Sequence, residues 1–283
     1  MTETLRWQVG DVRVTRVQEL QAPDISFVIP DVTAESIAGI DWIGPFRARN
    51  GDPLASVHTL VIEAGERRIL VDTCIGNDKR LPIPAWSGLQ TGFLADLAEA
   101  GFPPERIDTV LCTHLHIDHV GWNTRLEGER WVPTFANART LLARPEWEHW
   151  AADENEWNQQ ILADSVRPLF DADLVDLVET DCAVDDAVRL VPTPGHTPGH
   201  VSVAISSRGE EAIITGDLVH HPAQFAHPEW GAVVDTDPEQ ADRTRRAFMA
   251  RHADTPTLVI GTHFAGPTAG HLVRDGDAYR LEV

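Results

Sequence analysis

The sequence predicts an α/β fold in which two β-sheets pack together and helices cover their outer sides. Two observations lead to this prediction. Short β-rich runs and segments of helical periodicity alternate twice along the 283 residues, and hairpin patterns begin each half. No low-complexity linker separates the two halves. We therefore expect one domain spanning residues 1–283, a length that allows a sizeable core.

The first half is expected to contain a hairpin, a helix, a buried strand and a longer helical region. Residues Val57–Asp72 predict the hairpin, because two β-rich runs flank a turn at Ala64–Glu66. The helix at Phe93–Ala100 has apolar residues at helical spacing, and Gly101 and Pro103 close it. The strand and the second helical region are expected at Arg106–Thr113 and at Thr140–Trp150, the latter continuing to Leu162.

The second half begins near Leu174 and is richer in strands. Each expected strand is a short run of β-branched and aliphatic residues. An amphipathic helix at Pro238–His252 is preceded by a capping signal at Thr236 and Asp237. The expected strands are Val188–Val191, Val201–Ile205, Glu211–Thr215 and Thr257–Ile260.

The segment Ile25–Pro53 precedes the hairpin and has no regular periodicity. It carries several large apolar side chains. Exposed apolar loops near a site usually cover a substrate or meet another protein surface. We interpret residues 24–53 as a lid or as the contact of a homodimer.

The composition argues against several kinds of partner. The formal net charge of −21 repels nucleic acid and anionic lipid. No apolar run reaches the roughly 18 residues of a membrane span, and the first residues lack the pattern of a signal peptide. Cys74, Cys112 and Cys182 lie far apart, as in reduced proteins. We expect a cytoplasmic protein that acts on a small molecule and binds neither nucleic acid nor membrane.

The stretch His114-Leu115-His116-Ile117-Asp118-His119 places four metal-ligating side chains within six residues, directly after a buried strand. Imidazoles this close repel each other when protonated, and their polar atoms need partners when buried. A divalent cation supplies that partner. Since sites in α/β folds usually lie on loops at strand ends, we interpret the cluster as part of a metal site.

Three further strand ends each carry one candidate ligand: His196, Asp217 and His263. Strand ends share one rim of a sheet, so these residues can converge with the cluster. Five histidines and two aspartates, without a thiolate, suit Zn²⁺ and also Mn²⁺, Fe²⁺ or Co²⁺. Two such ions about 3.5–4 Å apart share a hydroxide and lower its pKa, which permits hydrolysis without a protein nucleophile.

From Val57 to Arg280 the chain resembles the metallo-β-lactamase-fold hydrolases, through the His-x-His-x-Asp-His motif and the three later ligands. The resemblance implies a four-layer αββα sandwich. It also implies that Asp217 bridges two metals, that Asp118 moves a proton, and that Asp72 orients a ligand. The implied ligands of the first metal are His114, His116 and His196, and those of the second are Asp118, His119 and His263.

The loops after the later strands are similar to the dinuclear branches of the family. Asp217 stands where β-lactamase types often have Cys, and Gly216–His220 resembles the methyl parathion hydrolase branch, as does Gly261–His263 followed by Gly270–Leu272. Acyl-homoserine lactonases typically have Tyr three residues after the bridging Asp, where this chain has His220. We expect His220 either to donate a hydrogen bond to a substrate oxygen or to support the site from its rim.

Aromatic residues near the motif are expected to bind the body of the substrate. Trp122 follows His119 by three residues, and Phe27, Trp42 and Phe46 lie in the irregular segment. They favour an apolar or aromatic substrate. The leading hypothesis is a hydrolase with two divalent metals, whose bridging hydroxide attacks a small neutral lactone, ester or phosphotriester.

Two alternatives remain open at this stage. A thioester hydrolase of the glyoxalase type would need a basic pocket for a carboxylate or phosphate, and Lys79 is the only lysine. A non-catalytic binding protein on the same fold would have no need to keep all seven ligands. A nuclease is disfavoured by the negative charge, and a flavo-diiron protein would require a flavin domain for which no residues remain.

Overall fold

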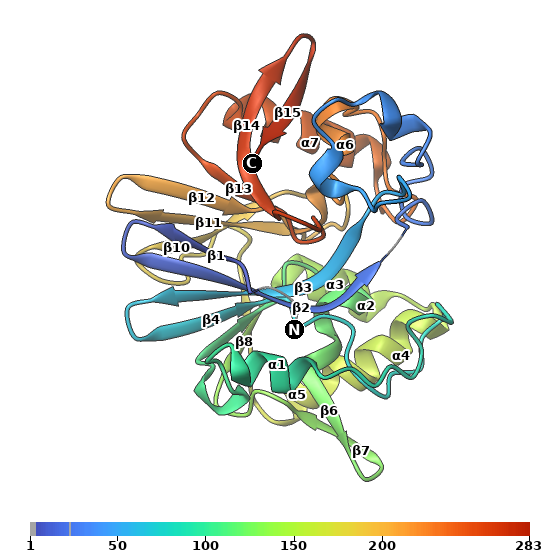
Figure 1. Ribbon diagram of the computed structural model, residues 1–283. Coiled ribbons are helices and arrows are strands. Elements are labelled where there is room, and N and C mark those ends of the chain that lie inside the picture. Colours follow the sequence, from blue (N-terminus) through green and yellow to red (C-terminus); the bar gives the residue numbers. More distant parts are fainter. Residues whose placement is uncertain (1–3, 23) are drawn as a thin grey trace. The chain divides into compact units, whose positions relative to one another are not determined.

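A computed structural model describes residues 4–22 and 24–283. The chain folds into two compact units. The first runs to Leu20 and resumes at Val57–Thr180, and the second combines Gln21–Ser56 with Asp181–Val283. Each unit contains one large sheet and its own helices (Figure 1). The predicted α/β class with two sheets is thus confirmed. Among the described residues, no helix is both long and apolar enough to span a membrane.

The first unit is built around a seven-stranded sheet of order β1-β2-β3-β4-β5-β8-β9. Strands β4, β5, β8 and β9 are parallel neighbours. Parallel strands place their carboxyl ends at one edge, which is where the His114 loop leaves β5. The bounds are β1 Arg6–Val9, β2 Val12–Ala22, β3 Ala55–Ala64, β4 Arg67–Val71, β5 Thr109–Leu111, β8 Arg139–Ala143 and β9 Val175–Val178.

The predicted hairpin at Val57–Asp72 is confirmed as β3 and β4. Ala64 pairs with Arg67, so Gly65 and Glu66 form a two-residue turn. Gly65 has φ +60°, a left-handed conformation that glycine adopts without strain. The hairpin places Asp72 directly beyond the end of β4.

Helix α1 at Phe93–Glu99 confirms the first predicted helix, and Phe93 and Leu97 on its buried face enter the core of the unit. A separate hairpin, β6–β7, extends from the unit (Figure 1). The other elements are η3 Pro104–Arg106, α2 Ile117–Val120, η4 Gly121–Asn123, β6 Thr124–Glu127, β7 Arg130–Pro133, α3 Arg144–Ala152, α4 Glu156–Ser165 and α5 Arg167–Asp171.

The prediction of a helix from Thr140 is wrong at its beginning. Residues up to Ala143 form β8, in which Thr140 pairs with Val110 of β5. The helix starts only at Arg144, where Pro145 occupies the first turn.

The prediction that the second half begins near Leu174 is also wrong, because β9 joins the first sheet beside β8. Short aliphatic runs do not distinguish a buried strand from a buried helix.

The second unit is built around a six-stranded sheet of order β10-β11-β12-β13-β14-β15. Strands β12 and β13 are parallel, and the other neighbours are antiparallel. Helix α7 has the predicted bounds, Pro238–His252, and the Asp237 side chain caps it by accepting the Gln240 N–H. The bounds are β10 Val188–Pro192, β11 Val201–Ser207, β12 Glu210–Ile214, η5 Gly216–Leu218, α6 Ala223–Ala226, β13 Leu258–Ile260, β14 Ala269–Asp275 and β15 Ala278–Glu282.

The segment before β3 is folded into the second unit. It contains two short 3₁₀ helices, η1 at Ser36–Gly39 and η2 at Gly44–Phe46. Most of its large apolar side chains are buried, and Phe46 packs edge-on against Phe264 at 6.3 Å. A role of residues 24–53 as a lid or dimer contact stays a prediction.

Lys79, the only lysine, is buried in the first unit. Its Nζ donates to the Thr124 hydroxyl at 2.7 Å and to the Asp164 carbonyl at 3.2 Å, and it lies 3.5 Å from the centre of the Trp131 ring. These contacts tie the loop after β4 to β6, β7 and α4. Burial disfavours the charged form and lowers the pKa of Lys79 to about 7.

The pKa of Lys79 predicts a pH-dependent stability. Above about pH 7 the folded chain loses a proton that the unfolded chain retains up to its ordinary pKa near 10.5. The free energy of unfolding should therefore rise by roughly 2 kcal/mol between pH 7 and pH 9. Urea unfolding at several pH values measures this rise. It should be absent in Lys79→Met and preserved in Arg80→Gln, an exposed neighbouring cation; parallel curves for Lys79→Met and the parent protein would contradict it.

Candidate metal centre

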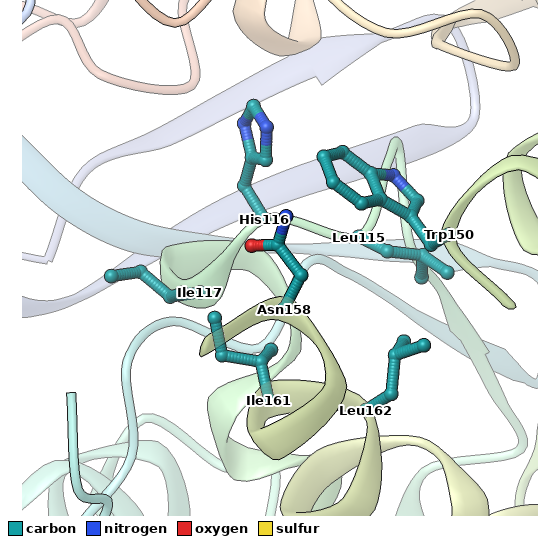
Figure 2. Close-up of a pocket in the computed structure, with 7 residues that line it drawn as sticks. All are labelled: Leu115, His116, Ile117, Trp150, Asn158, Ile161 and Leu162. Carbon is teal, nitrogen blue, oxygen red and sulfur yellow. The ribbon is translucent and has the colours of Figure 1, made fainter. Parts of the chain in front are cut away.

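The ligand-rich loop of the first unit follows β5 and continues into α2. His114 and His119 are fully buried, whereas His116 and Asp118 are partly exposed. His114 Nε2 lies 3.1 Å from His116 Nδ1, and the rings of His114 and His119 are 4.0 Å apart. The structure thus brings the predicted ligands of this unit together. His116 also lines a small pocket with Trp150 and Asn158 (Figure 2).

Asp72 holds this loop from the end of β4. Its carboxylate accepts the Thr113 N–H at 2.7 Å and the Thr113 hydroxyl at 2.9 Å. Oδ2 also lies 2.9 Å from His119 Nδ1, which must be the donor because an ionised carboxylate only accepts. The expected orienting contact of Asp72 is confirmed. Asp72 has φ +58°, a strained conformation that these hydrogen bonds maintain.

Two loops of the first unit approach each other closely behind the ligands. Gly121 donates its N–H to the Cys74 carbonyl at 2.8 Å, and Thr73 donates to the His119 carbonyl at 2.8 Å. A Cβ atom built on Gly121 would lie 1.7 Å from the Ile75 carbonyl oxygen. Only glycine permits this approach, which fixes the end of α2 and therefore the backbone of His119.

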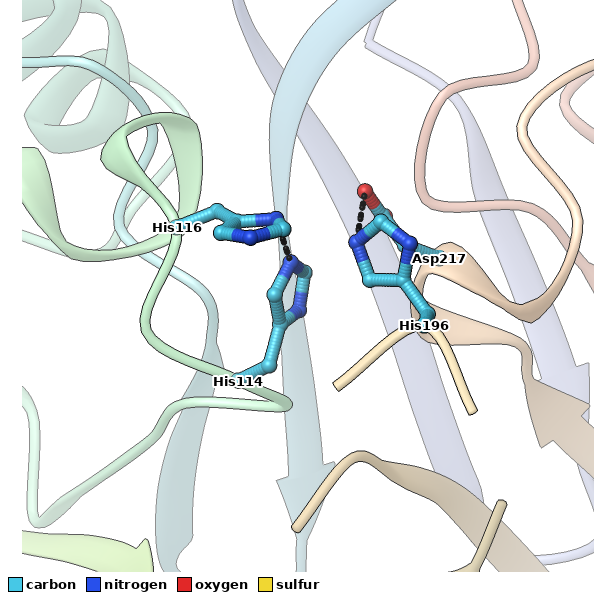
Figure 3. Close-up of side chains that lie close together, drawn as sticks. All are labelled: His114, His116, His196 and Asp217. Atoms are coloured by element: carbon cyan, nitrogen blue, oxygen red, sulfur yellow. Dashed lines mark hydrogen bonds and ion pairs between the residues drawn. The ribbon is translucent and has the colours of Figure 1, made fainter. Parts of the chain in front are cut away.

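The second unit gathers two predicted histidine ligands around the carboxylate of a third predicted ligand, Asp217. Asp217 Oδ1 lies 3.1 Å from His263 Nε2, and Asp217 Oδ2 lies 3.5 Å from His196 Nε2. Figure 3 draws His196 with Asp217 and, from the first unit, His114 with His116. Asp217 is itself held because its N–H donates to His200 Nε2 at 2.8 Å.

The far nitrogen of two imidazoles in the second unit is occupied by an acceptor. His196 Nδ1 lies 2.8 Å from Asp235 Oδ1, and His263 Nδ1 lies 3.0 Å from the Ser56 carbonyl oxygen. Both acceptors require a proton on Nδ1. Each ring is then a neutral imidazole whose Nε2 carries a lone pair, provided that no second proton is bound.

This arrangement fits a divalent cation. In His119, His196 and His263 the Nε2 lone pair faces a carboxylate oxygen at 3.1–3.6 Å. Two acceptors repel at this distance unless a cation or a proton lies between them. Protonation would create imidazolium ions at positions that are at most 5% exposed, which is costly. The donors are nitrogen and oxygen, as in sites for Zn²⁺ and similar ions.

His220 belongs to the same group in the second unit. It is buried, its Nε2 lies 3.2 Å from Asp217 Oδ2, and its ring is parallel to that of His263 at 5.9 Å. Neither ring nitrogen has a hydrogen-bond partner among the described residues. A buried imidazole left in this state has donor and acceptor capacity available for a ligand.

The four aromatic residues predicted to bind substrate differ in how far they are buried. Trp122 is buried, stacks on Phe93 at 5.8 Å, and donates its indole N–H to Glu19 at 2.6 Å. Phe46 is fully buried, Trp42 is half-buried, and Phe27 is 49% exposed. Trp122 and Phe46 are as buried as core side chains, whereas the side chain of Phe27 is accessible to solvent. Contact of these four residues with a substrate stays a prediction.

The cysteines are not part of either ligand group. Burial raises the pKa of the Cys74 and Cys112 thiols, so both remain protonated and poor metal ligands.

Sequence reasoning missed the residues that hold the ligands, namely Asp235, Ser56 and Glu146. Asp235 lies 39 positions from its partner His196, and its pKa is raised by burial. Ser56 acts through its carbonyl, which leaves no signal in the sequence.

Curated relatives match part of the chain. An N-acyl homoserine lactonase from Bacillus sp. is 32% identical over 130 residues, which is 46% of this chain and 45% of that protein. The corresponding Bacillus cereus protein is 31% identical over 111 residues, 39% of this chain and 38% of that protein. The chain therefore spans less than half the length of these relatives.

Solved structures match nearly all of the chain. The hydrolase AbOPH of the beta lactamase superfamily superposes with a TM-score of 0.82 at 23% identity, covering 99% of this chain and 97% of that one. AidC, a dizinc quorum-quenching lactonase, gives a TM-score of 0.80 at 22% identity, with 99% and 96% covered. At these identities the likeness shows the fold. The sequence model of the Metallo-beta-lactamase superfamily matches residues 52–271, more than three quarters of the chain. The chain belongs to the metallo-β-lactamase superfamily.

Proposed function

We propose that this chain is a metal-dependent hydrolase that holds two divalent ions and cleaves a small neutral lactone, ester or phosphotriester. The observation that carries the proposal is the set of buried imidazoles whose Nδ1 atoms are held by acceptors while their Nε2 atoms face carboxylates. Family membership supports it, as do the lactonases among the curated relatives. Cleavage of an ester-type bond in particular is supported by those relatives alone.

All seven predicted ligands enter the proposal. His114, His116 and His196 are assigned to one ion, and Asp118, His119 and His263 to the other, with Asp217 shared between them. Zn²⁺ is the ion best matched to these donors, and the dizinc lactonase AidC is a structural neighbour. Mn²⁺, Fe²⁺ and Co²⁺ accept the same donors.

The bound ions would polarise a carbonyl or phosphoryl oxygen and supply hydroxide near neutral pH. Side chains near the ions would hold and transfer the protons of the reaction. Asp118 is 14% exposed and its Oδ1 lies 3.6 Å from His119 Nε2, so it can exchange a proton with solvent. His220 has two unoccupied ring nitrogens beside Asp217 and is assigned to bind a substrate oxygen.

The charge of the chain supports a neutral substrate. A net charge of −21 repels polyanions and does not hinder an uncharged lactone or ester. The thioester alternative gains no support, because the only lysine is buried against Thr124 and Trp131 and is not available to bind a carboxylate. A homodimer and a cytoplasmic location stay predictions.

The direct test is the metal content of protein purified without chelator, combined with a hydrolysis panel. The panel contains a lactone, an aryl ester, a phosphotriester, a thioester and a β-lactam. We expect about two metals per chain and turnover of the lactone, ester or phosphotriester. Absence of metal together with no activity after adding Zn²⁺, Mn²⁺ or Co²⁺ would favour a binding protein. Turnover of the thioester alone would favour the glyoxalase type.

Asp217→Asn should lower the rate of hydrolysis at least about 100-fold. Asn has one carbonyl oxygen and no charge, so it cannot serve two cations as a carboxylate does. Metal per chain, measured by elemental mass spectrometry, should fall with activity. Asp176→Asn, which changes a half-exposed aspartate paired with Arg139, serves as the control and should retain both activity and metal. Full activity of Asp217→Asn at normal metal content would overturn the assignment.

Asp235→Ala should weaken metal binding without unfolding the protein, because alanine removes the acceptor of the His196 Nδ1 proton. Its carboxylate fixes the tautomer of His196 through a 2.8 Å hydrogen bond, and loss of such a partner typically costs 10–100-fold in metal affinity. Competition with a chromophoric chelator measures this affinity. An unchanged affinity would show that His196 does not need the Asp235 carboxylate to present Nε2 to a metal.

His220→Phe should lower turnover about 10-fold or more while leaving two metals bound. Phenylalanine preserves the ring stacking on His263 and removes both ring nitrogens. Steady-state kinetics and metal content are measured on the same sample. Unchanged kinetics on every panel compound would reduce His220 to a packing residue, and loss of metal would identify it as an additional ligand.

A further inference from the structure

Helix α3 of the first unit carries a buried acid, Glu146, that the proposed reaction does not use. Its side chain is 1% exposed. Glu146 Oε1 accepts the backbone N–H of Leu115 at 3.0 Å and the indole N–H of Trp150 at 2.7 Å. Leu115 lies between His114 and His116, so the carboxylate holds the main chain that carries both imidazoles.

A carboxylate at this position is costly to bury, and the two hydrogen bonds compensate for its lost solvation. Charged acceptors form the stronger class of protein hydrogen bonds. Glu146 and Trp150 are four residues apart on α3 and therefore share one helix face. One oxygen atom thus connects the helix to the ligand loop.

Trp150 transmits this connection to His116. The two rings meet edge-on, with centroids 5.3 Å apart and an interplanar angle of 63°. Because Glu146 fixes the indole N–H, the plane of Trp150 is set, and the imidazole of His116 packs against a fixed surface. His116 is the N-cap residue of α2, and its side chain makes no capping hydrogen bond to the helix.

The same tryptophan forms a wall of the pocket in Figure 2. The pocket contains about 230 Å³ of space not filled by atoms, including space open to solvent. Its other lining residues are mostly aliphatic. They are Leu115, His116, Ile117, Asn158, Ile161 and Leu162.

We propose that Glu146 is a positioning residue. It aligns His114 and His116 for metal binding through the Leu115 amide, and through Trp150 it sets the wall of the adjoining pocket. The inference rests on the proposed function, because the histidines need alignment only if they bind metal. A purely structural acid would instead stabilise α3 without affecting the ligands.

The experiment compares three variants with the parent chain. Glu146→Gln keeps a carbonyl oxygen that both N–H groups can reach, whereas Glu146→Leu removes the acceptor at similar size. Asp164→Leu is the matched control, because Asp164 is a buried acid on the adjacent helix α4 whose carboxylate contacts Gln160 and not the ligand loop. Zn²⁺ affinity is measured by chelator competition, and folding is monitored by thermal unfolding of the metal-free proteins.

We expect Glu146→Leu to bind Zn²⁺ 10–100-fold more weakly at the site that uses His114 and His116, and Glu146→Gln to bind within about threefold of the parent. The Co²⁺-substituted Glu146→Leu protein should also show an altered d–d absorption spectrum. Asp164→Leu should lower the melting temperature with unchanged affinity and spectrum. Equal Zn²⁺ affinity of Glu146→Leu and Asp164→Leu would overturn the proposal.

A readout without metal separates this inference from the proposed function. Exchange of the Leu115 amide hydrogen in the metal-free protein should be at least 10-fold faster in Glu146→Leu than in Glu146→Gln. If the parent chain binds no metal, the proposed function fails. If it binds metal and the Leu115 amide exchanges at the same rate in both variants, only the role of Glu146 fails.

Trp150→Phe tests the second half of the inference. This change removes the indole N–H and narrows the ring, while the hydrogen bond from Leu115 to Glu146 remains available. Zn²⁺ affinity should stay within threefold of the parent, and KM should change several-fold for panel compounds with a larger apolar group while kcat on the smallest compound is preserved. A KM unchanged across the series would show that the pocket does not contact the substrate.

Discussion

The structure depends on the fixed tautomer of its buried imidazoles. His119 donates from Nδ1 to Asp72, His196 to Asp235, and His263 to the Ser56 carbonyl. Each bond commits the opposite nitrogen to act as a lone-pair donor. In both units buried carboxylates or backbone carbonyls therefore determine which ring nitrogen is available to bind a metal, in the absence of any ion.

Backbone conformations that would be unfavourable alone are retained for this purpose. Asp72 adopts a left-handed φ directly after β4, and Gly121 brings its main chain against the Ile75 carbonyl. These features place the carboxylate of Asp72 under His119 and close the turn that follows it. A replacement that relaxed either backbone would release the imidazole from its acceptor, so local strain and ligand geometry are linked.

The candidate ligands could be proposed from the sequence because they combine metal-binding side chains with the spacing of strand-end loops. The His114–His119 stretch is contiguous, and Asp217 and His263 each follow a recognisable strand. The partners of the ligands could not be predicted. Ser56 contributes only its carbonyl, and Glu146 reaches the ligand loop from a helix that the sequence places incorrectly, since the run from Thr140 to Ala143 is a strand.

The aromatic residues illustrate a second limit of sequence reasoning. Trp122 is a candidate because of its proximity to the motif, and the structure adds that its indole is stacked on Phe93 and bonded to Glu19. Four hydrogen bonds reach Glu19 from the chain segments around it, and burial raises its pKa. A side chain's distance along the chain from a ligand does not determine which of its faces is buried.

Each unit places several carboxylates near candidate metal-binding histidines, which favours the binding of a cation. In the first unit Asp72 and Asp118 lie against His119, and Glu146 binds the main chain between His114 and His116. In the second unit Asp217 lies against His263 and Asp235 against His196. All of these carboxylates except that of Asp118 are deeply buried, which is costly without positive charge nearby. A divalent ion would relieve that cost, and by mutual dependence it would stabilise the folded chain. The acids that orient the ligands therefore also make metal binding and folding parts of one equilibrium.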